Sequence, residues 1–242
     1  MEQHFFAAPA RREKLRIAAA LKERQQTNRK RWLTSPELRI AASILIIVGL
    51  TFGIWYALRS GESEFDKGLA ALQTAYSGQR PIEPRVSALP HSAYSQTRGS
   101  SVDEQRADNL RRAQLHLEQA VREKPAPEAY HALGKVYLAQ GKFDEAIKEF
   151  QQSLSGSRDQ ARIYNDLGVA WLEKGDSNRS LDSFNKALQL DGNLQEALFN
   201  RALAYEKQSR FDEAKTNWNE YLKRDSTSPW ADEARRHLTL IS

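Results

Sequence analysis

The sequence predicts an all-α protein: an α-solenoid of about three stacked helix pairs with flanking capping helices, preceded by one N-terminal transmembrane helix. Two observations predict the solenoid. Residues of similar size recur every 34 positions between Pro127 and roughly Asp225, and within each unit they fall on one face of a 3.6-residue helix. A third observation, an uncharged apolar run at residues 40–58, predicts the membrane helix.

The 34-residue period has three copies, at residues 127–160, 161–194 and 195–228. In the first two copies a glycine, Gly141 or Gly175, supplies the turn that ends the first helix. Small residues recur where the two helices of a pair must approach, since bulky side chains would force them apart. The pairs of small residues are Gly134 with Ala146, Gly168 with Ser180, and Ala202 with Ala214. A single pair cannot bury its apolar face, so about three or more must stack.

The repeated positions resemble the tetratricopeptide repeat (TPR) family, over about 100 of the 242 residues. The matching residues are Tyr130, Leu133, Gly134, Tyr137, Gly141, Ala146, Phe150 and Leu154; Tyr164, Leu167, Gly168, Trp171, Gly175, Phe184, Ala187 and Leu188; and Leu198, Ala202, Tyr205, Ala214, Trp218 and Leu222. Ser209 stands where the family has its turn glycine. Tyr221 stands where it has a small residue, which fits a terminal unit that packs against the following helix.

Residues 1–39 form a basic arm with ten Lys or Arg and four Asp or Glu, so the basic balance of the chain comes from this arm and not from the repeats. Residues 40–58 span about 28 Å as a helix, close to the thickness of the bilayer core. Trp55 and Tyr56 lie near one end of this run, where aromatic rings favour the membrane interface. A topology signal is the favoured role of the arm, with binding to anionic headgroups as the alternative; we expect no nucleic-acid partner.

The basic excess before the span predicts a cytoplasmic N-terminus and translocated repeats. We therefore expect a single-pass protein of a bacterial inner (cell) membrane with an extracytoplasmic, periplasmic TPR domain. The long basic region and the lack of a nearby Ala-x-Ala site favour an uncleaved anchor over a signal peptide. Gly49 and Gly53 lie one turn apart and would suit a homodimer of membrane helices, although chance spacing is the favoured interpretation.

Residues 59–103 are predicted to be a short helix followed by a Pro/Gly/Ser-rich linker. Within it, Arg80-Pro81-Ile82-Glu83-Pro84 is favoured as a plain spacer, and an extended segment resting on a groove is the alternative. Residues 104–242 are the predicted TPR domain. Residues 104–124 match the second half of a repeat without its first helix, so we expect this helix to cover the N-terminal side of the stack. Residues 229–240 are the expected capping helix at the other end.

The residues that carry enzyme chemistry are missing or misplaced, so the sequence predicts no enzyme, no metal site and no cofactor. The chain has no cysteine, which excludes disulfides and cysteine-based zinc sites. None of the five histidines is spaced to chelate a metal from one helix or to form a known catalytic pair. A phosphate-binding loop and a nucleophile motif are also lacking. Binding is therefore the predicted class of function.

The TPR resemblance implies a concave face, lined by the first helix of each pair, that holds a protein or peptide partner. The residues implied to face the ligand are His131, Lys135 and Leu138; Arg162, Asn165, Val169 and Leu172; and Glu196, Phe199, Asn200, Leu203 and Glu206. An acidic C-terminal tail is not the expected ligand, because Glu196 stands where the family's carboxylate clamp has a lysine. Phe199 is the expected apolar anchor, flanked by Arg162 and Lys135.

The favoured function is a membrane-anchored scaffold or adaptor that mediates protein–protein interaction through this face. The alternative is a regulatory subunit of a membrane signalling or proteolytic system, whose basic N-terminal arm contacts a cytoplasmic partner. The layout resembles the leading part of larger bacterial proteins that end in a caspase-like peptidase domain, through Gly78-Gln79-Arg80-Pro81, and we expect no peptidase domain here. A third hypothesis is a cytoplasm-facing receptor with reversed topology.

Overall fold

The structure is a computed structural model and describes residues 19, 21–24, 51, 61–94 and 101–242. The chain divides into Met1–Gly61 and Glu62–Ser242, and the helical stack belongs to the second unit. The expected basic arm and membrane helix lie almost wholly outside the described residues, as do Gly49 and Gly53. Of the helices in the described part of the chain, none combines the length and the apolar character that a membrane crossing requires.

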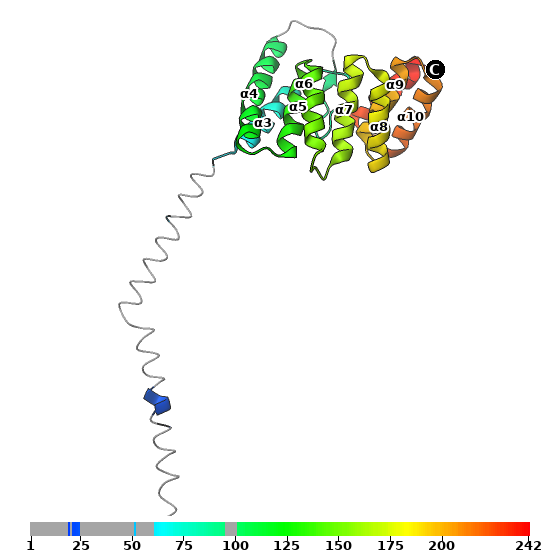
Figure 1. Ribbon diagram of the computed structural model, residues 1–242. Helices are drawn as coiled ribbons and strands as arrows, with labels where there is room; N and C mark the ends of the chain where they lie inside the picture. The colour runs from blue at the N-terminus through cyan, green and yellow to red at the C-terminus, as the bar shows by residue number, and fades with distance from the viewer. Residues whose placement is uncertain (1–18, 20, 25–50, 52–60, 95–100) are drawn as a thin grey trace, which may run out of the picture. The chain divides into compact units, whose positions relative to one another are not determined.

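The second unit is a row of antiparallel helices with a small two-stranded sheet (Figure 1). The helices are α3 (Glu64–Tyr76), α4 (Ser101–Glu123), α5 (Pro127–Ala139), α6 (Phe143–Leu154), α7 (Gln160–Lys174), α8 (Ser177–Leu190), α9 (Gln195–Lys207), α10 (Phe211–Arg224) and α11 (Pro229–Leu240). Strands β1 (Gln79–Arg80) and β2 (Ala93–Tyr94) pair in parallel. The helices α5 to α10 form the three pairs that the 34-residue period predicts, and α11 covers residues 229–240 as expected.

Close approach within the first two pairs depends on a missing side chain. A Cβ atom added to Gly134 would lie 2.6 Å from the ring of Phe150, and one added to Gly168 would lie 2.5 Å from the ring of Phe184. Both rings are fully buried. The predicted need for a small residue is therefore confirmed at Gly134 and Gly168, because a larger residue would displace an aromatic ring from the core. The residues that they approach are Phe150 and Phe184 and not the small partners Ala146 and Ser180 that the sequence predicts.

The turns between paired helices use the left-handed backbone region. Gly141 has φ of 74° and Gly175 has φ of 91°, a conformation that glycine adopts without steric cost. Ser209 keeps the same conformation with φ of 58°, so the third turn retains its geometry although the glycine is missing. An L-residue is strained there by roughly 1–2 kcal/mol.

One expectation about the N-terminal side of the stack is wrong. The helix at residues 104–124 is not an isolated half-repeat, because α4 packs against α3 as a fourth helix pair. A Cβ added to Gly68 of α3 would meet Leu117 of α4 at 2.5 Å, the same kind of contact that Gly134 makes with Phe150. The folded unit accordingly begins at Glu62 and not at residue 104. Residues 77–100 separate α3 from α4 and break the 34-residue spacing, which hid the pair.

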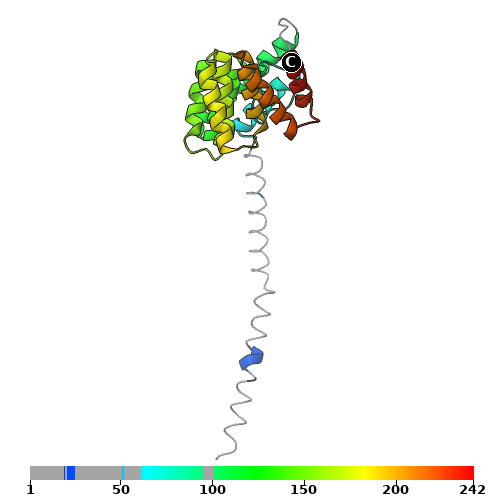
Figure 2. The same cartoon turned by 90° about the vertical axis from the view of Figure 1, so that its right-hand side faces the viewer.

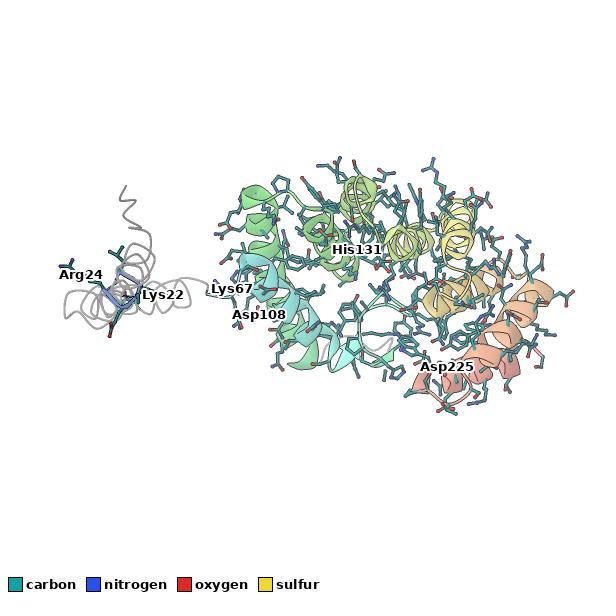
Figure 3. All side chains as sticks on the ribbon, turned by 90° about the horizontal axis from the view of Figure 1, so that it is seen from below. Lys22, Arg24, Lys67, Asp108, His131 and Asp225 are labelled. Carbon is teal, nitrogen blue, oxygen red and sulfur yellow. The ribbon has the colours of Figure 1, made fainter. Side chains whose placement is uncertain are left out.

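The segment between α3 and α4 does not leave the stack as a spacer. Residues 77–94, called the inserted segment below, lie inside the arc that the helices form (Figure 3). Figure 2 shows this segment, in cyan to teal, on the same side of the row as α11 and away from α8. Ile82 and Val86 are buried in the main hydrophobic core. The favoured interpretation, a plain spacer, is therefore wrong. The alternative is borne out in that the segment rests on the stack, but residues 81–84 bend and residues 87–88 form a turn, so the segment is not extended.

Candidate functional site: an inner face filled by the chain's own segment

The inner face of the stack, formed by α5, α7 and α9, holds the inserted segment by its main chain at Arg85. The Arg85 amide donates to Oδ1 of Asn200 at 2.7 Å. Nδ2 of Asn200 donates back to the Arg85 carbonyl at 2.8 Å, and Nδ2 of Asn165 reaches the same carbonyl at 3.2 Å. Asn200 thus pairs with both peptide groups of one residue, as a neighbouring strand would. Both asparagines are fully buried.

Ser87, two residues further on, is held in the same way. Its amide donates to Oδ1 of Asp166 at 2.8 Å, and its carbonyl accepts from Nζ of Lys135 at 2.7 Å. Its hydroxyl donates to the carbonyl of Arg162 at 3.2 Å. Main-chain groups of both Arg85 and Ser87 therefore hydrogen bond to the inner face, and a turn at residues 87–88 follows directly.

A buried group of charges supports this contact. Nε2 of His131 lies 2.7 Å from Oδ2 of Asp166, and Nζ of Lys135 lies 3.8 Å from the same oxygen. Burial acts to raise the pKa of Asp166, but Lys135, His131 and the Ser87 amide lower it by more. Burial lowers the pKa of His131 and, together with Lys135, outweighs the opposing effect of Asp166. Burial likewise lowers the pKa of Lys135. A buried carboxylate of this kind is stable only with its partners in place.

Arg80 fixes the two ends of the inserted segment to α11. Its guanidinium donates to both carboxylate oxygens of Glu233, at 2.8 and 2.5 Å, and to the carbonyl of Ser92 at 2.6 Å. His91 also contacts Glu233, at 3.0 Å. Arg80 is 2 % exposed. Burial acts to raise the pKa of Glu233, but Arg80 and His91 lower it by more, so this carboxylate is charged when it meets the guanidinium.

Arg85 inserts its side chain among aromatic rings from three helices. The guanidinium carbon lies 4.6 Å from the ring centre of Trp230, 5.6 Å from that of Tyr221 and 5.8 Å from that of Phe199. Nη1 donates to the Tyr221 hydroxyl at 2.8 Å. Aromatic faces attract a guanidinium through the ring quadrupole, so these rings form an arginine pocket.

Of the twelve predicted ligand-facing residues, Lys135, Asn165 and Asn200 hydrogen bond to the inserted segment through their side chains, and most of the twelve are buried. Eight are buried: Lys135, Leu138, Asn165, Val169, Leu172, Phe199, Asn200 and Leu203. His131, Glu196 and Glu206 are partly buried, and Arg162 is exposed. Phe199 is no open anchor, because Trp218, Tyr221, Trp230 and Arg85 surround it. Glu206 is engaged by Trp218 and His237.

Sequence reasoning missed Asp166, Glu233, Trp230 and the arginines of the inserted segment. The repeat alignment contains one feature that indicates Asp166. Ala132, Asp166 and Asn200 stand 34 residues apart, at a position that the first copy fills with a small buried residue. A carboxylate or an amide at such a position requires a buried partner. Tyr221 was expected to face the following helix; it also contacts Arg85 of the inserted segment.

The helical stack matches a known repeat family. A family model described as tetratricopeptide repeat matches residues 102–157 and 131–194, and a second model of the same description matches residues 196–228. Together the matches cover more than half of the chain. The chain belongs to the tetratricopeptide repeat family. TPR proteins typically bind other proteins, and the polar inner face of this chain fits that role.

Two curated relatives share only part of their length with this TPR chain. The peptidyl-prolyl cis-trans isomerase PASTICCINO1 of Arabidopsis thaliana is 28% identical over 103 residues, which are 39% of this chain and 16% of that protein. The photosystem I assembly protein Ycf3 of Synechococcus sp. (strain CC9605) is 27% identical over 97 residues, 39% of this chain and 53% of that protein. The chain therefore spans about half the length of the second relative and much less of the first.

The solved structures support the same fold. A chain in the crystal structure of the APC/C hetero-tetramer Cut9-Hcn1 matches with a TM-score of 0.50 at 21% identity, covering 58% of this chain and 28% of that chain. At this identity the likeness concerns the TPR fold alone. Within the residues that the structure describes, no group of three or more His, Asp or Glu side chains is arranged to hold a metal ion.

Proposed function

We propose that this chain is a membrane-anchored scaffold or adaptor whose tetratricopeptide repeats hold a peptide segment of a partner protein on their inner face. The observation that carries the proposal is the way Asn200, Asp166 and Lys135 hold Arg85 and Ser87 by main-chain groups. Every peptide has such groups, so a face equipped in this way suits peptide ligands in general. Because the chain's own segment fills the face, a partner has to compete with it.

The membrane part of the proposal rests on the sequence. The apolar run at residues 40–58 has the length of a bilayer-spanning helix, and the basic residues before it favour a cytoplasmic N-terminus. The TPR unit would then work outside the cytoplasm of a bacterial cell, anchored to the inner membrane.

Protease accessibility tests this topology. Protease is added to intact cells, to spheroplasts with an intact inner membrane, and to lysed membranes, and the fragment Glu62–Ser242 is followed with an antibody. We expect digestion as soon as the outer barrier is opened. Protection until the inner membrane is lysed would contradict the topology and favour the cytoplasm-facing receptor.

Site-directed photo-crosslinking tests the interaction. A photoreactive residue replaces Arg162, whose side chain is 48% exposed on α7 beside the contact with Ser87. The matched control replaces the exposed Lys186 on α8. We expect a discrete adduct in living cells from position 162 and none from position 186. Equal labelling from both positions, or none from position 162, would reject a partner on the inner face.

A further inference from the structure

We infer that the inserted segment is an intramolecular ligand, and that the site it fills takes from another protein a proline-containing peptide with two arginines five residues apart. The inference rests on the proposed function, because it specifies the ligand chemistry of the same inner face. The segment itself supplies the pattern, Arg80-Pro81-Ile82-Glu83-Pro84-Arg85. Three features of the site support this assignment: two arginine sites and a set of main-chain contacts between α5, α7 and α9.

The first arginine site recognises a planar, charged fork. Glu233 meets the Arg80 guanidinium with both oxygens, and the ring centre of Trp230 lies 4.6 Å from the guanidinium carbon. Two parallel hydrogen bonds to one carboxylate require the geometry of arginine, which lysine cannot supply. Because Glu233 is 7 % exposed, its charge would be costly to bury without such a partner.

The second arginine site is aromatic and shares one ring with the first. Trp230 lies 4.6 Å from the guanidinium carbons of both Arg80 and Arg85. Tyr221 adds a hydroxyl acceptor to this second site. The shared ring fixes the separation between the two guanidinium groups, so the site selects the spacing of the arginines as well as their charge.

Between and beyond the arginines the site recognises main chain. The hydrogen bonds that Asn200, Asn165, Asp166 and Lys135 make to the inserted segment all go to peptide groups of residues 85 and 87, apart from the bond between Asn165 and the Ser87 hydroxyl. These contacts fix the path of the main chain without demanding particular side chains. The two prolines between the arginines fix φ at their own positions, which limits the freedom of the unbound peptide and lowers the entropy lost on binding.

The intramolecular ligand fits its site imperfectly. Ala88, at the tip of the segment, has φ of 57°, a strained value for a residue with a side chain. Nε of Arg85 and Oγ of Ser92 are buried and have no protein hydrogen-bond partner. Because the segment belongs to the same chain, it has a high effective concentration at the site. These defects weaken its binding, so a peptide that fits the site better can displace it.

Binding in trans tests the inference directly. In the full-length chain, purified in detergent, residues 79–92 are replaced by a Gly/Ser linker of equal length, and a synthetic peptide with the sequence of residues 79–94 is titrated by calorimetry. We expect saturable 1:1 binding to this variant and at least tenfold weaker binding to the unmodified chain, whose site is filled. A peptide with lysine at both arginine positions, or the added substitution Glu233→Gln, should weaken binding at least tenfold.

Two results would overturn the inference. One is that the replacement variant keeps its helical circular dichroism and cooperative unfolding but does not bind the peptide. The other is that the lysine peptide binds as well as the arginine peptide, which would indicate unspecific charge attraction.

A second variant covers the case in which the linker replacement does not fold. The double substitution Arg80→Ala and Arg85→Ala leaves Ile82 and Val86 in the core, and it should bind the peptide at least tenfold more tightly than the unmodified chain. Equal binding to both chains would overturn the inference. If the peptide does not bind while position 162 still crosslinks a partner in cells, the scaffold role stands and the proposed arginine recognition is wrong. If the peptide binds but position 162 crosslinks nothing in cells, only the cellular partner is rejected.

Discussion

At the scale of single residues, Asp166 joins the helical stack to the inserted segment. Its fully buried carboxylate accepts from the Ser87 amide and from Asn165, and it contacts His131 and Lys135. Removing one of these partners would leave the buried charge of Asp166 partly uncompensated, which would lower the stability of the fold. Whatever moves the inserted segment must therefore also hydrate or neutralise Asp166.

The pH dependence of stability follows from the histidine in this group. The pKa of His131 is lowered from 6.5 in the folded protein, so below pH 6.5 the unfolded chain binds more protons than the folded one. The free energy of unfolding therefore falls as the pH is lowered from 6.5. Asp166 and Glu233, whose pKa values are also lowered, extend the loss of stability below about pH 4.5.

Urea unfolding at pH 7.5 and pH 5.5 measures this effect. The unmodified chain should lose more stability between the two pH values than the variant His131→Gln, whose neutral amide can still hydrogen bond to Asp166. An equal loss in both proteins would show that His131 does not contribute.

The helix contact at Gly168 gives a second prediction at this scale. Gly168→Val places a branched side chain where a Cβ alone would lie 2.5 Å from the buried ring of Phe184, and we expect a loss of about 2 kcal/mol in the free energy of unfolding. The control is Gly192→Val, since the nearest atom to an added Cβ there is at 3.7 Å. Guanidinium unfolding that gave equal stability for both variants would contradict the packing account.

At the scale of elements, the helix pairs could be predicted because their contacts are local. Gly134 and Phe150, or Gly168 and Phe184, lie 16 residues apart and repeat every 34. The pair of α3 and α4 was not predicted, because residues 77–100 separate Gly68 from Leu117 and interrupt the period. The path of the inserted segment could not be predicted for a different reason. Arg80 and Glu233, which hold it, are 153 residues apart, and no periodic pattern links them.

The bond between Arg80 and Glu233 gives a prediction at the element scale. Either Arg80→Ala or Glu233→Gln should lower the free energy of unfolding by about 3 kcal/mol, because each leaves a buried partner unpaired. The double variant should lose much less than the sum of the two single losses, which a double-mutant cycle measures. The exposed pair Arg111 and Asp108 on α4 is the control, and Arg111→Ala should have little effect. Additive losses for Arg80 and Glu233 would contradict a direct coupling.

At the scale of the whole molecule, the stack and its ligand belong to one chain. Position along the repeat predicted a ligand-facing surface, and three of the residues named for it, Lys135, Asn165 and Asn200, contact the inserted segment. That they face a partner protein stays a prediction. The repeat could not indicate that this face is already filled, because residues 77–94 carry no helical period and gain their conformation from tertiary contacts. Because the inner face is filled, we expect a partner to bind only after the inserted segment has been displaced from the folded stack.

The most direct test of this account is amide hydrogen exchange of the full-length chain, resolved to single residues. The Arg85 and Ser87 amides donate to Asn200 and Asp166, so we expect both to be protected. They should nevertheless exchange faster than the amides in the middle of α7 and α9, because the segment opens while the stack stays folded. No protection at Arg85 and Ser87 would show that the segment does not fill the inner face. Exchange only at the rate of global unfolding would show that it is a fixed part of the core and not a displaceable ligand.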